Sequence, residues 1–307
     1  MLDPDKLVWY QREPVAWCYD HLGVRLWEKQ EEILYALVED SRVAVPSCHE
    51  SGKTFVAACA VCWYITCFYM SRIVTTAPTD RQVRIVLWND IRRMHRRLKE
   101  KFEFVGDIFQ KEWRIMDGWN AIGFSTDDEN AFQGLHSPYG NIMGIFDEAT
   151  GISKQIFEQA DGVIMGENAK NLLLGNPTAP NNYFHWCCEG KISGYRVIPI
   201  SALDSPNIEP DGHGWYRNKK VMPFPSLVEM GFVNKMIKDY GIDSPQVRAR
   251  VFGEFPKSAQ DQLISNEMLA AALHKGVYLR KMVEMARTGE EIVPSHKLTE
   301  KQRWARK

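Results

Sequence analysis

The sequence predicts an α/β fold, in which a mainly parallel sheet is flanked by helices. Short apolar runs alternate with longer helix-like segments from about residue 27 to residue 205. Three of these runs, residues 43–45, 142–146 and 171–175, end in polar residues of distinct chemistry. Because the carboxyl ends of parallel strands meet at one edge of a sheet, we expect these polar ends to form one binding site.

The first run leads into a loop that is typical of phosphate-binding sites. Residues 43–45 precede a polar turn, then Gly52-Lys53-Thr54, then an apolar run over residues 55–70. In such loops, N–H groups at a helix N-terminus surround the phosphates, a Lys reaches their outer oxygens and a Thr holds Mg²⁺. Ser47 stands where the usual pattern has its first glycine. The residues that we expect to bind the nucleotide are Ser47, Cys48, His49, Glu50, Ser51, Gly52, Lys53 and Thr54.

The apolar run at residues 55–70 is about as long as a short membrane span. Because it follows the phosphate loop and contains a Thr, we predict a buried helix and no membrane partner. The seven cysteines show no second pair at zinc spacing, so they are interpreted as reduced thiols in a cytosol. Cys48 lies in the loop itself, and we expect its oxidation or alkylation to crowd a bound triphosphate.

A strand at residues 72–79 and a helix at residues 79–102 are predicted next. The apolar face of this helix consists of Val83, Leu87, Ile91, Met94 and Leu98. Its basic residues are Arg92, Arg93, Arg96, Arg97, Lys99 and Lys101. They could contact DNA phosphates without reading bases, although an ordinary solvated helix face has the same pattern. The net charge of −1 gives no overall basic field. Residues 112–116 and 119–124 flank Asp117-Gly118, which predicts a hairpin.

The strand at residues 142–146 delivers two adjacent carboxylates, Asp147 and Glu148. We predict that Asp147 completes the Mg²⁺ shell with Thr54, and that Glu148 orients the attacking water. The strand at residues 171–175 ends at Asn176, whose amide could bond the outermost phosphate or the water and couple hydrolysis to movement. Gly-Asn-Pro is also ordinary turn chemistry. The predicted catalytic residues are Glu148, Lys53 and Asn176.

Together these features favour a RecA-like (ASCE) P-loop fold, because other strands intervene between the phosphate loop and the Asp-Glu strand. We divide the chain into a lead-in (1–26), an ATPase core (27–205), a small helical lid (206–257) and a helical and polar tail (258–307). Within the lid, helices are expected at residues 226–240 and 245–252. Within the tail, a helix or two are expected at residues 266–287.

The chain resembles the large, ATPase subunit of tailed-bacteriophage terminases. The resemblance covers roughly residues 27–256 and is carried by the phosphate loop and by short motifs at residues 76–79, 134–137, 175–178, 200–207 and 250–256. It implies ATP and Mg²⁺ as cofactors, and Gln30 as a residue that reads adenine. It also implies double-stranded DNA, the terminase small subunit and the portal of a procapsid as partners, a homo-oligomeric ring, and a location in the host cytoplasm.

The resemblance is incomplete in two places. His49 replaces an Arg that is common in the family, and no strand ending in an Asp follows Pro256. Endonuclease activity is therefore not expected from this chain alone. An Arg from a neighbouring subunit is expected at the site. Arg248 and Arg250 are candidates, although no motif in the sequence identifies either one. Two alternatives stay open: a helicase-like or other DNA-remodelling ATPase, and a non-catalytic assembly subunit that binds a nucleotide.

Overall fold

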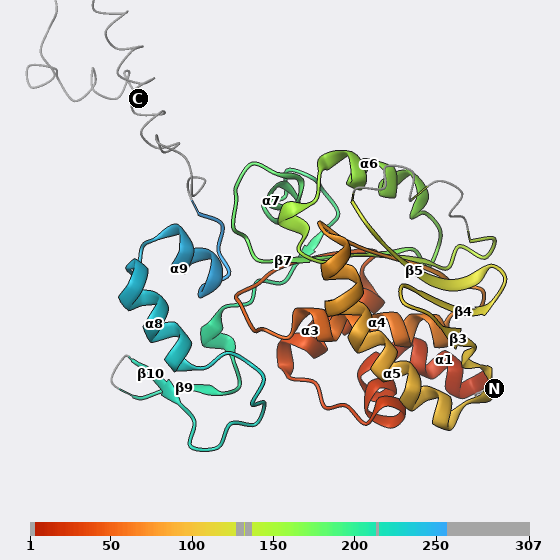
Figure 1. Ribbon diagram of the computed structural model, residues 1–307, viewed down its shortest axis with the longest axis horizontal. Helices are drawn as coiled ribbons and strands as arrows, with labels where there is room; N and C mark the ends of the chain where they lie inside the picture. Colours follow the sequence, from red (N-terminus) through yellow and green to blue (C-terminus); the bar gives the residue numbers. More distant parts are fainter. Residues whose placement is uncertain (1–3, 127–131, 133–136, 213–214, 257–307) are drawn as a thin grey trace, which may run out of the picture. The chain divides into compact units, whose positions relative to one another are not determined.

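An eight-stranded sheet forms the centre of the fold (Figure 1). The computed structural model describes residues 4–126, 132, 137–212 and 215–256, and the chain up to Pro256 forms one unit. From β5 to β8 the neighbouring strands pair in parallel, whereas β3 and β4 are antiparallel additions at one edge. In spatial order the strands are β3 (Asp107–Ile108), β4 (Glu112–Met116), β5 (Trp119–Ser125), β2 (Arg72–Ala77), β6 (Ile142–Phe146), β7 (Lys170–Gly175), β1 (Arg42–Pro46) and β8 (Arg196–Val197).

Helices cover both faces of this sheet (Figure 1). One face carries α1 (Pro4–Arg12), α3 (Glu28–Glu39), α4 (Lys53–Cys67) and α5 (Trp88–Lys101), and the other carries α6 (Lys154–Val163) and α7 (Tyr183–Cys188). The remaining described elements include α2 (Pro14–Trp17), α8 (Met230–Tyr240), α9 (Pro245–Arg250) and the hairpin of β9 (Ile208–Pro210) and β10 (Tyr216–Asn218).

The central strands are apolar on both sides, as strands between two helical layers must be. In β7, Leu172 and Leu174 join the core under α4, whereas Leu173 joins the core under α6 and α7. β6 alternates in the same way, with Ile145 on one side and Phe146 on the other. This alternation explains why the sequence shows continuous apolar runs instead of alternating polarity.

The order of the strands decides the fold class. β7 lies between β1, which leads into the phosphate loop, and β6, which carries the two acids. The prediction of a RecA-like fold is therefore confirmed. The predicted hairpin also forms: Met116 pairs with Trp119, and Gly118 takes a positive φ of 77° that suits glycine.

The apolar run after the phosphate loop forms α4, whose residues from Val56 to Cys67 are all buried. None of the described helices is both long and apolar enough to cross a membrane. The helix predicted at residues 79–102 consists of a π-helical turn at Gln82–Leu87 followed by α5. All five residues of its predicted apolar face are buried.

The last part of the described chain differs slightly from the prediction. α8 begins at Met230 instead of residue 226, because residues 225–227 form a turn and the backbone N–H of Val228 donates to the carbonyl of Glu50. Residues 134–136 of one family-like motif, the predicted helix at residues 266–287 and the polar tail lie outside the described residues. The internal division of the chain at residues 26 and 205 stays a prediction.

Candidate nucleotide-binding site

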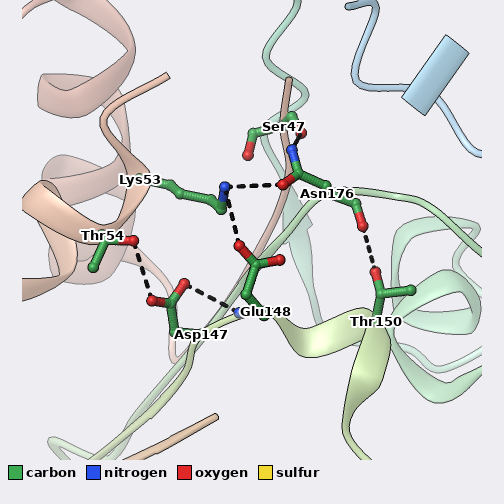
Figure 2. A network of polar contacts seen from close by, with 7 residues as sticks. All are labelled: Ser47, Lys53, Thr54, Asp147, Glu148, Thr150 and Asn176. Carbon is green, nitrogen blue, oxygen red and sulfur yellow. Dashed lines mark hydrogen bonds and ion pairs between the residues drawn. The ribbon is translucent and has the colours of Figure 1, made fainter. Parts of the chain in front are cut away.

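Three neighbouring strand ends bring the predicted catalytic side chains together (Figure 2). Lys53 follows β1 through the loop, Asp147 and Glu148 follow β6, and Asn176 follows β7. The Lys53 Nζ lies 3.1 Å from Asn176 Oδ1 and 3.4 Å from Glu148 Oε1. The pairing of β1 with β7 and of β7 with β6 explains the meeting, because these parallel strands end at the same edge.

The Thr54 hydroxyl and the Asp147 carboxylate form the second contact of the site. Thr54 Oγ1 donates to Asp147 Oδ2 at 3.1 Å. Asp147 is buried, and this burial raises its pKa to about 6 against the opposing effects of Lys53 and Thr54. One carboxylate and one hydroxyl suit Mg²⁺, which takes few protein ligands and completes its shell with water and phosphate oxygens. In the described residues no group of three His, Cys, Asp or Glu forms a fuller metal cage.

Glu148 is held in a strained backbone conformation. Its φ is 52°, in the left-handed region that non-glycine residues seldom adopt. Its backbone N–H donates to Asp147 Oδ1 at 3.1 Å, so the first acid helps to hold the turn that presents the second. About one third of the Glu148 side chain is exposed, which leaves its carboxylate within reach of water.

Asn176 connects the site to two neighbouring segments. Its Nδ2 donates to the backbone carbonyl of Ser47 at 2.6 Å, and its backbone carbonyl accepts from the Thr150 hydroxyl at 2.6 Å (Figure 2). Thr150 follows the two acids, so Asn176 bridges the phosphate loop and the Asp-Glu turn. No sequence signal marks Thr150, because a side chain that donates to a backbone carbonyl belongs to no motif.

The phosphate loop provides a run of unpaired backbone donors. Among the described residues no acceptor pairs with the N–H groups from Glu50 to Phe55. Gly52 takes a φ of 76° and Lys53 begins α4, so this run ends at the positive end of a helix dipole. Unpaired N–H groups at a helix N-terminus are suited to phosphate oxygens. This part of the loop therefore fits a di- or triphosphate.

The first three residues of the loop have a different role. The N–H groups of Ser47, Cys48 and His49 donate to the carbonyls of Gly175, Ile200 and Arg250. These bonds hold the loop to β7 and to two later segments, so their donors are not free for a ligand. The His49 ring stacks on Phe232 at 6.2 Å. Its burial, with the charges of Lys53 and Arg250, lowers the pKa of the ring.

The structure bears on whether Cys48 can be modified at all; the effect of its modification on a bound triphosphate stays a prediction. Cys48 is fully buried, and its burial raises the pKa of the thiol to about 12. Because the thiolate is the reactive form, we expect iodoacetamide at pH 8 to leave Cys48 unmodified in the folded chain. Peptide mapping by mass spectrometry before and after denaturation would measure this. Equal labelling of Cys48 in both states would show that the loop is open.

The side chains of Trp27 and Gln30 hold the loop through its backbone carbonyls. Trp27 Nε1 donates to the carbonyl of Ser51 at 3.3 Å, and Gln30 Nε2 donates to that of Gly52 at 3.0 Å. Gln30 also lines a cleft of about 540 Å³ beside Lys53 and Thr54. Its role as an adenine reader stays a prediction, since the structure shows its amide bonded to the loop.

Gly52 is the position of the loop that tolerates a side chain least. A Cβ there would lie 2.5 Å from Gln30 Nε2, and the φ is positive. We expect Gly52→Ala to lower the free energy of unfolding by at least about 1–2 kcal/mol. Urea unfolding would measure it. The matched control is Gly162→Ala in α6, where nothing lies within 4 Å and the same change should stabilise by about 0.5–1 kcal/mol.

The basic residues of α5 are mostly engaged within the chain. Arg92 and Arg97 donate to the carbonyls of Gln110 and Leu22, and Lys101 donates to that of Asp20. Arg93 and Lys99 form ion pairs on or near the same helix. Of the six basic residues, only Arg96 has no such partner in the described part of the chain. These contacts favour the ordinary solvated face over a dedicated DNA surface.

The two candidate arginine fingers both lie in the last turn of α9. Arg248 Nη2 pairs with Glu254 Oε2 at 2.9 Å, and the carbonyl of Arg250 accepts the N–H of His49. Arg250 therefore lies beside the phosphate loop of its own chain. That position speaks against its acting at the site of a neighbouring subunit.

The chain is similar in sequence to a terminase large subunit and in fold to a terminase ATPase domain. No protein-family model matches the chain. A curated relative, a probable terminase large subunit of Enterobacteria phage P7, is 26% identical over 266 residues, which is 83% of this chain and 50% of the relative. The resemblance to terminase large subunits is confirmed. This chain thus spans about half the length of the terminase subunit that it matches.

Solved structures agree at the level of the fold. The ATPase domain of the Thermus phage P74-26 large terminase matches with a TM-score of 0.57 and 16% identity, over 79% of this chain and 98% of that one. A mutant form of the same terminase domain matches with a TM-score of 0.56. At this identity the likeness shows that the sheet and helices are arranged as in a terminase ATPase domain, and no more.

Proposed function

We propose that this chain is the Mg²⁺-dependent ATPase motor domain of a terminase large subunit, which moves double-stranded DNA into a procapsid. The observation that carries the proposal is the meeting of Lys53, Asp147, Glu148 and Asn176 beside the free N–H groups of the phosphate loop. Mg²⁺, when bound, would neutralise phosphate charge and polarise the transferred phosphoryl group.

Each side chain has a part in this proposal. The Lys53 ammonium, which is almost fully buried, binds phosphate oxygens, and Thr54 with Asp147 holds the metal. Glu148 orients water and accepts its proton. Asn176 links the phosphate loop to the Asp-Glu turn and can pass the loss of the outermost phosphate to both segments.

The rest of the proposal follows from the relatives. The partners would be double-stranded DNA, the small subunit and a portal, and several copies of the chain would form a ring in the host cytoplasm. Residues 27–205 would be the ATPase core and residues 206–257 a lid, with residues 1–26 packed on the core. The described residues contain one mainly parallel sheet, which would be the sheet of this ATPase core.

Phosphate release by the purified chain tests the proposal. We expect hydrolysis of ATP that requires Mg²⁺, stops with EDTA, and rises when duplex DNA, portal and procapsid are added. Nucleotide binding with no hydrolysis under any of these conditions would instead support a non-catalytic assembly subunit. Hydrolysis that responds to single-stranded but not to duplex DNA would favour a helicase-like enzyme.

A further inference from the structure

The cleft beside the phosphate loop contains a carboxylate that the proposed hydrolysis does not use. Asp90 lies in the first turn of α5 and lines this cleft together with Phe55 and Arg93. About three quarters of its side chain is buried, and Oδ1 accepts from Arg93 Nη2 at 2.8 Å. In the described part of the chain no donor pairs with Asp90 Oδ2. One oxygen is therefore fixed, and the other is left for a ligand.

The position of Asp90 relative to the phosphates follows from the loop. The free N–H groups end at Phe55, the residue after Thr54, and the side chain of Phe55 lines the same cleft. A nucleotide with its outer phosphates at Lys53 and Thr54 would extend its nucleoside along this wall. The cleft volume of about 540 Å³ lies within the ordinary range for small-molecule sites.

Charge limits which part of a nucleotide can meet Asp90. A carboxylate would repel a phosphate, whereas it accepts hydrogen bonds well from neutral hydroxyl groups. A carboxylate that binds ribose hydroxyls is a known solution in other nucleotide sites. Arg93 compensates the charge of Asp90 and engages Oδ1, which leaves Oδ2 as the oxygen that can accept from a ligand.

We propose that Asp90 accepts a hydrogen bond from a ribose hydroxyl of the bound nucleotide, so that the site discriminates against an analogue that lacks this hydroxyl. Arg93 is a positioning residue for this contact. The inference rests on the proposed function, because it needs a triphosphate bound at Lys53.

Equilibrium binding of ATP, 2′-deoxy-ATP and 3′-deoxy-ATP to the full chain tests the inference. We expect the wild type to bind ATP at least about tenfold more tightly than one of the two deoxy analogues, the size of a lost hydrogen bond to a charged group. Asp90→Ala should lose most of this discrimination. Asp107→Ala is the matched control, because Asp107 pairs with Lys99 of the same helix but is 76% exposed and does not line the cleft.

The outcomes separate this inference from the proposed function. Equal affinity of the wild type for all three nucleotides would overturn the role of Asp90, whether or not the variant folds. Unchanged discrimination in Asp90→Ala would do the same. GTP is measured as a fourth ligand: if Asp90→Ala loses a preference for ATP over GTP and keeps the ribose preference, Asp90 contacts the base and the inference is overturned. If the wild type binds no ATP, the proposed function itself fails, and this inference with it.

Discussion

Glu148→Gln is expected to bind ATP and to hydrolyse it at least about a hundredfold more slowly than the wild type, the usual scale when a general base is lost. Glutamine keeps the size of the side chain and an oxygen that can face Lys53 Nζ, which lies 3.4 Å from Glu148 Oε1. It cannot accept a proton from water. Steady-state phosphate release and equilibrium binding of ATP would measure the two effects separately.

A surface glutamate provides the control for this variant. Glu158 lies on α6, pairs with Lys154 and is 54% exposed, so Glu158→Gln should hydrolyse ATP at the wild-type rate. Turnover near the wild-type value in Glu148→Gln would remove the residue from its assigned role. Loss of ATP binding in that variant would mean that Glu148 mainly positions Lys53.

The ion pair between Lys53 and Glu148 has a consequence for ligand binding. The Lys53 ammonium contacts both Glu148 and Asn176. A phosphate that binds this ammonium must therefore displace these contacts or share the ammonium with them. Glu148 would then be free to turn toward water while Asn176 stays bonded to the carbonyl of Ser47. The positive φ of Glu148 costs conformational energy, and such strain is common where a side chain must be held in a functional position.

The sequence predicted the sheet and the three strand ends because these depend on local pattern. The apolar runs at residues 142–146 and 171–175 could be recognised as strands, and a parallel sheet then requires their polar ends to meet. The RecA-like order followed from the strands that separate the loop from Asp147. Gly175-Asn-Pro177 also suits a simple turn, but in the structure the Asn176 side chain accepts a hydrogen bond from Lys53.

What the sequence could not show was the backbone pairing around the loop. The N–H groups of Cys48 and His49 bond carbonyls about 150 and 200 residues away in sequence, at Ile200 and Arg250. Such bonds use groups that every residue has, so no residue type marks them. For the same reason the sequence predicts that the loop has N–H groups for phosphate, but not that the unpaired ones run from Glu50 to Phe55. For the basic residues of α5 the sequence left two interpretations open, because three of them pair with backbone carbonyls that no residue type marks.

Lys53→Met is expected to reduce ATP hydrolysis by on the order of 10²–10³-fold or more, because it removes a preorganised charge from the phosphates. The same change removes the cation that lowers the pKa of buried Asp147. That carboxyl should therefore hold its proton more tightly and bind Mg²⁺ more weakly. Phosphate release at several Mg²⁺ concentrations would detect both effects, with Lys154→Met on the surface of α6 as the control.

Stability separates this explanation from simple unfolding. Methionine keeps much of the volume of lysine, and the Glu148 carboxylate left behind is about one third exposed, so water can solvate it. The loss of unfolding free energy should stay below the roughly 3–5 kcal/mol that breaking a fully buried pair costs. A folded Lys53→Met chain that hydrolyses ATP at the wild-type rate would contradict the assignment of the loop, because Thr54 and Asn176, which lie with Lys53 in the strand-end cluster, carry no positive charge to replace it.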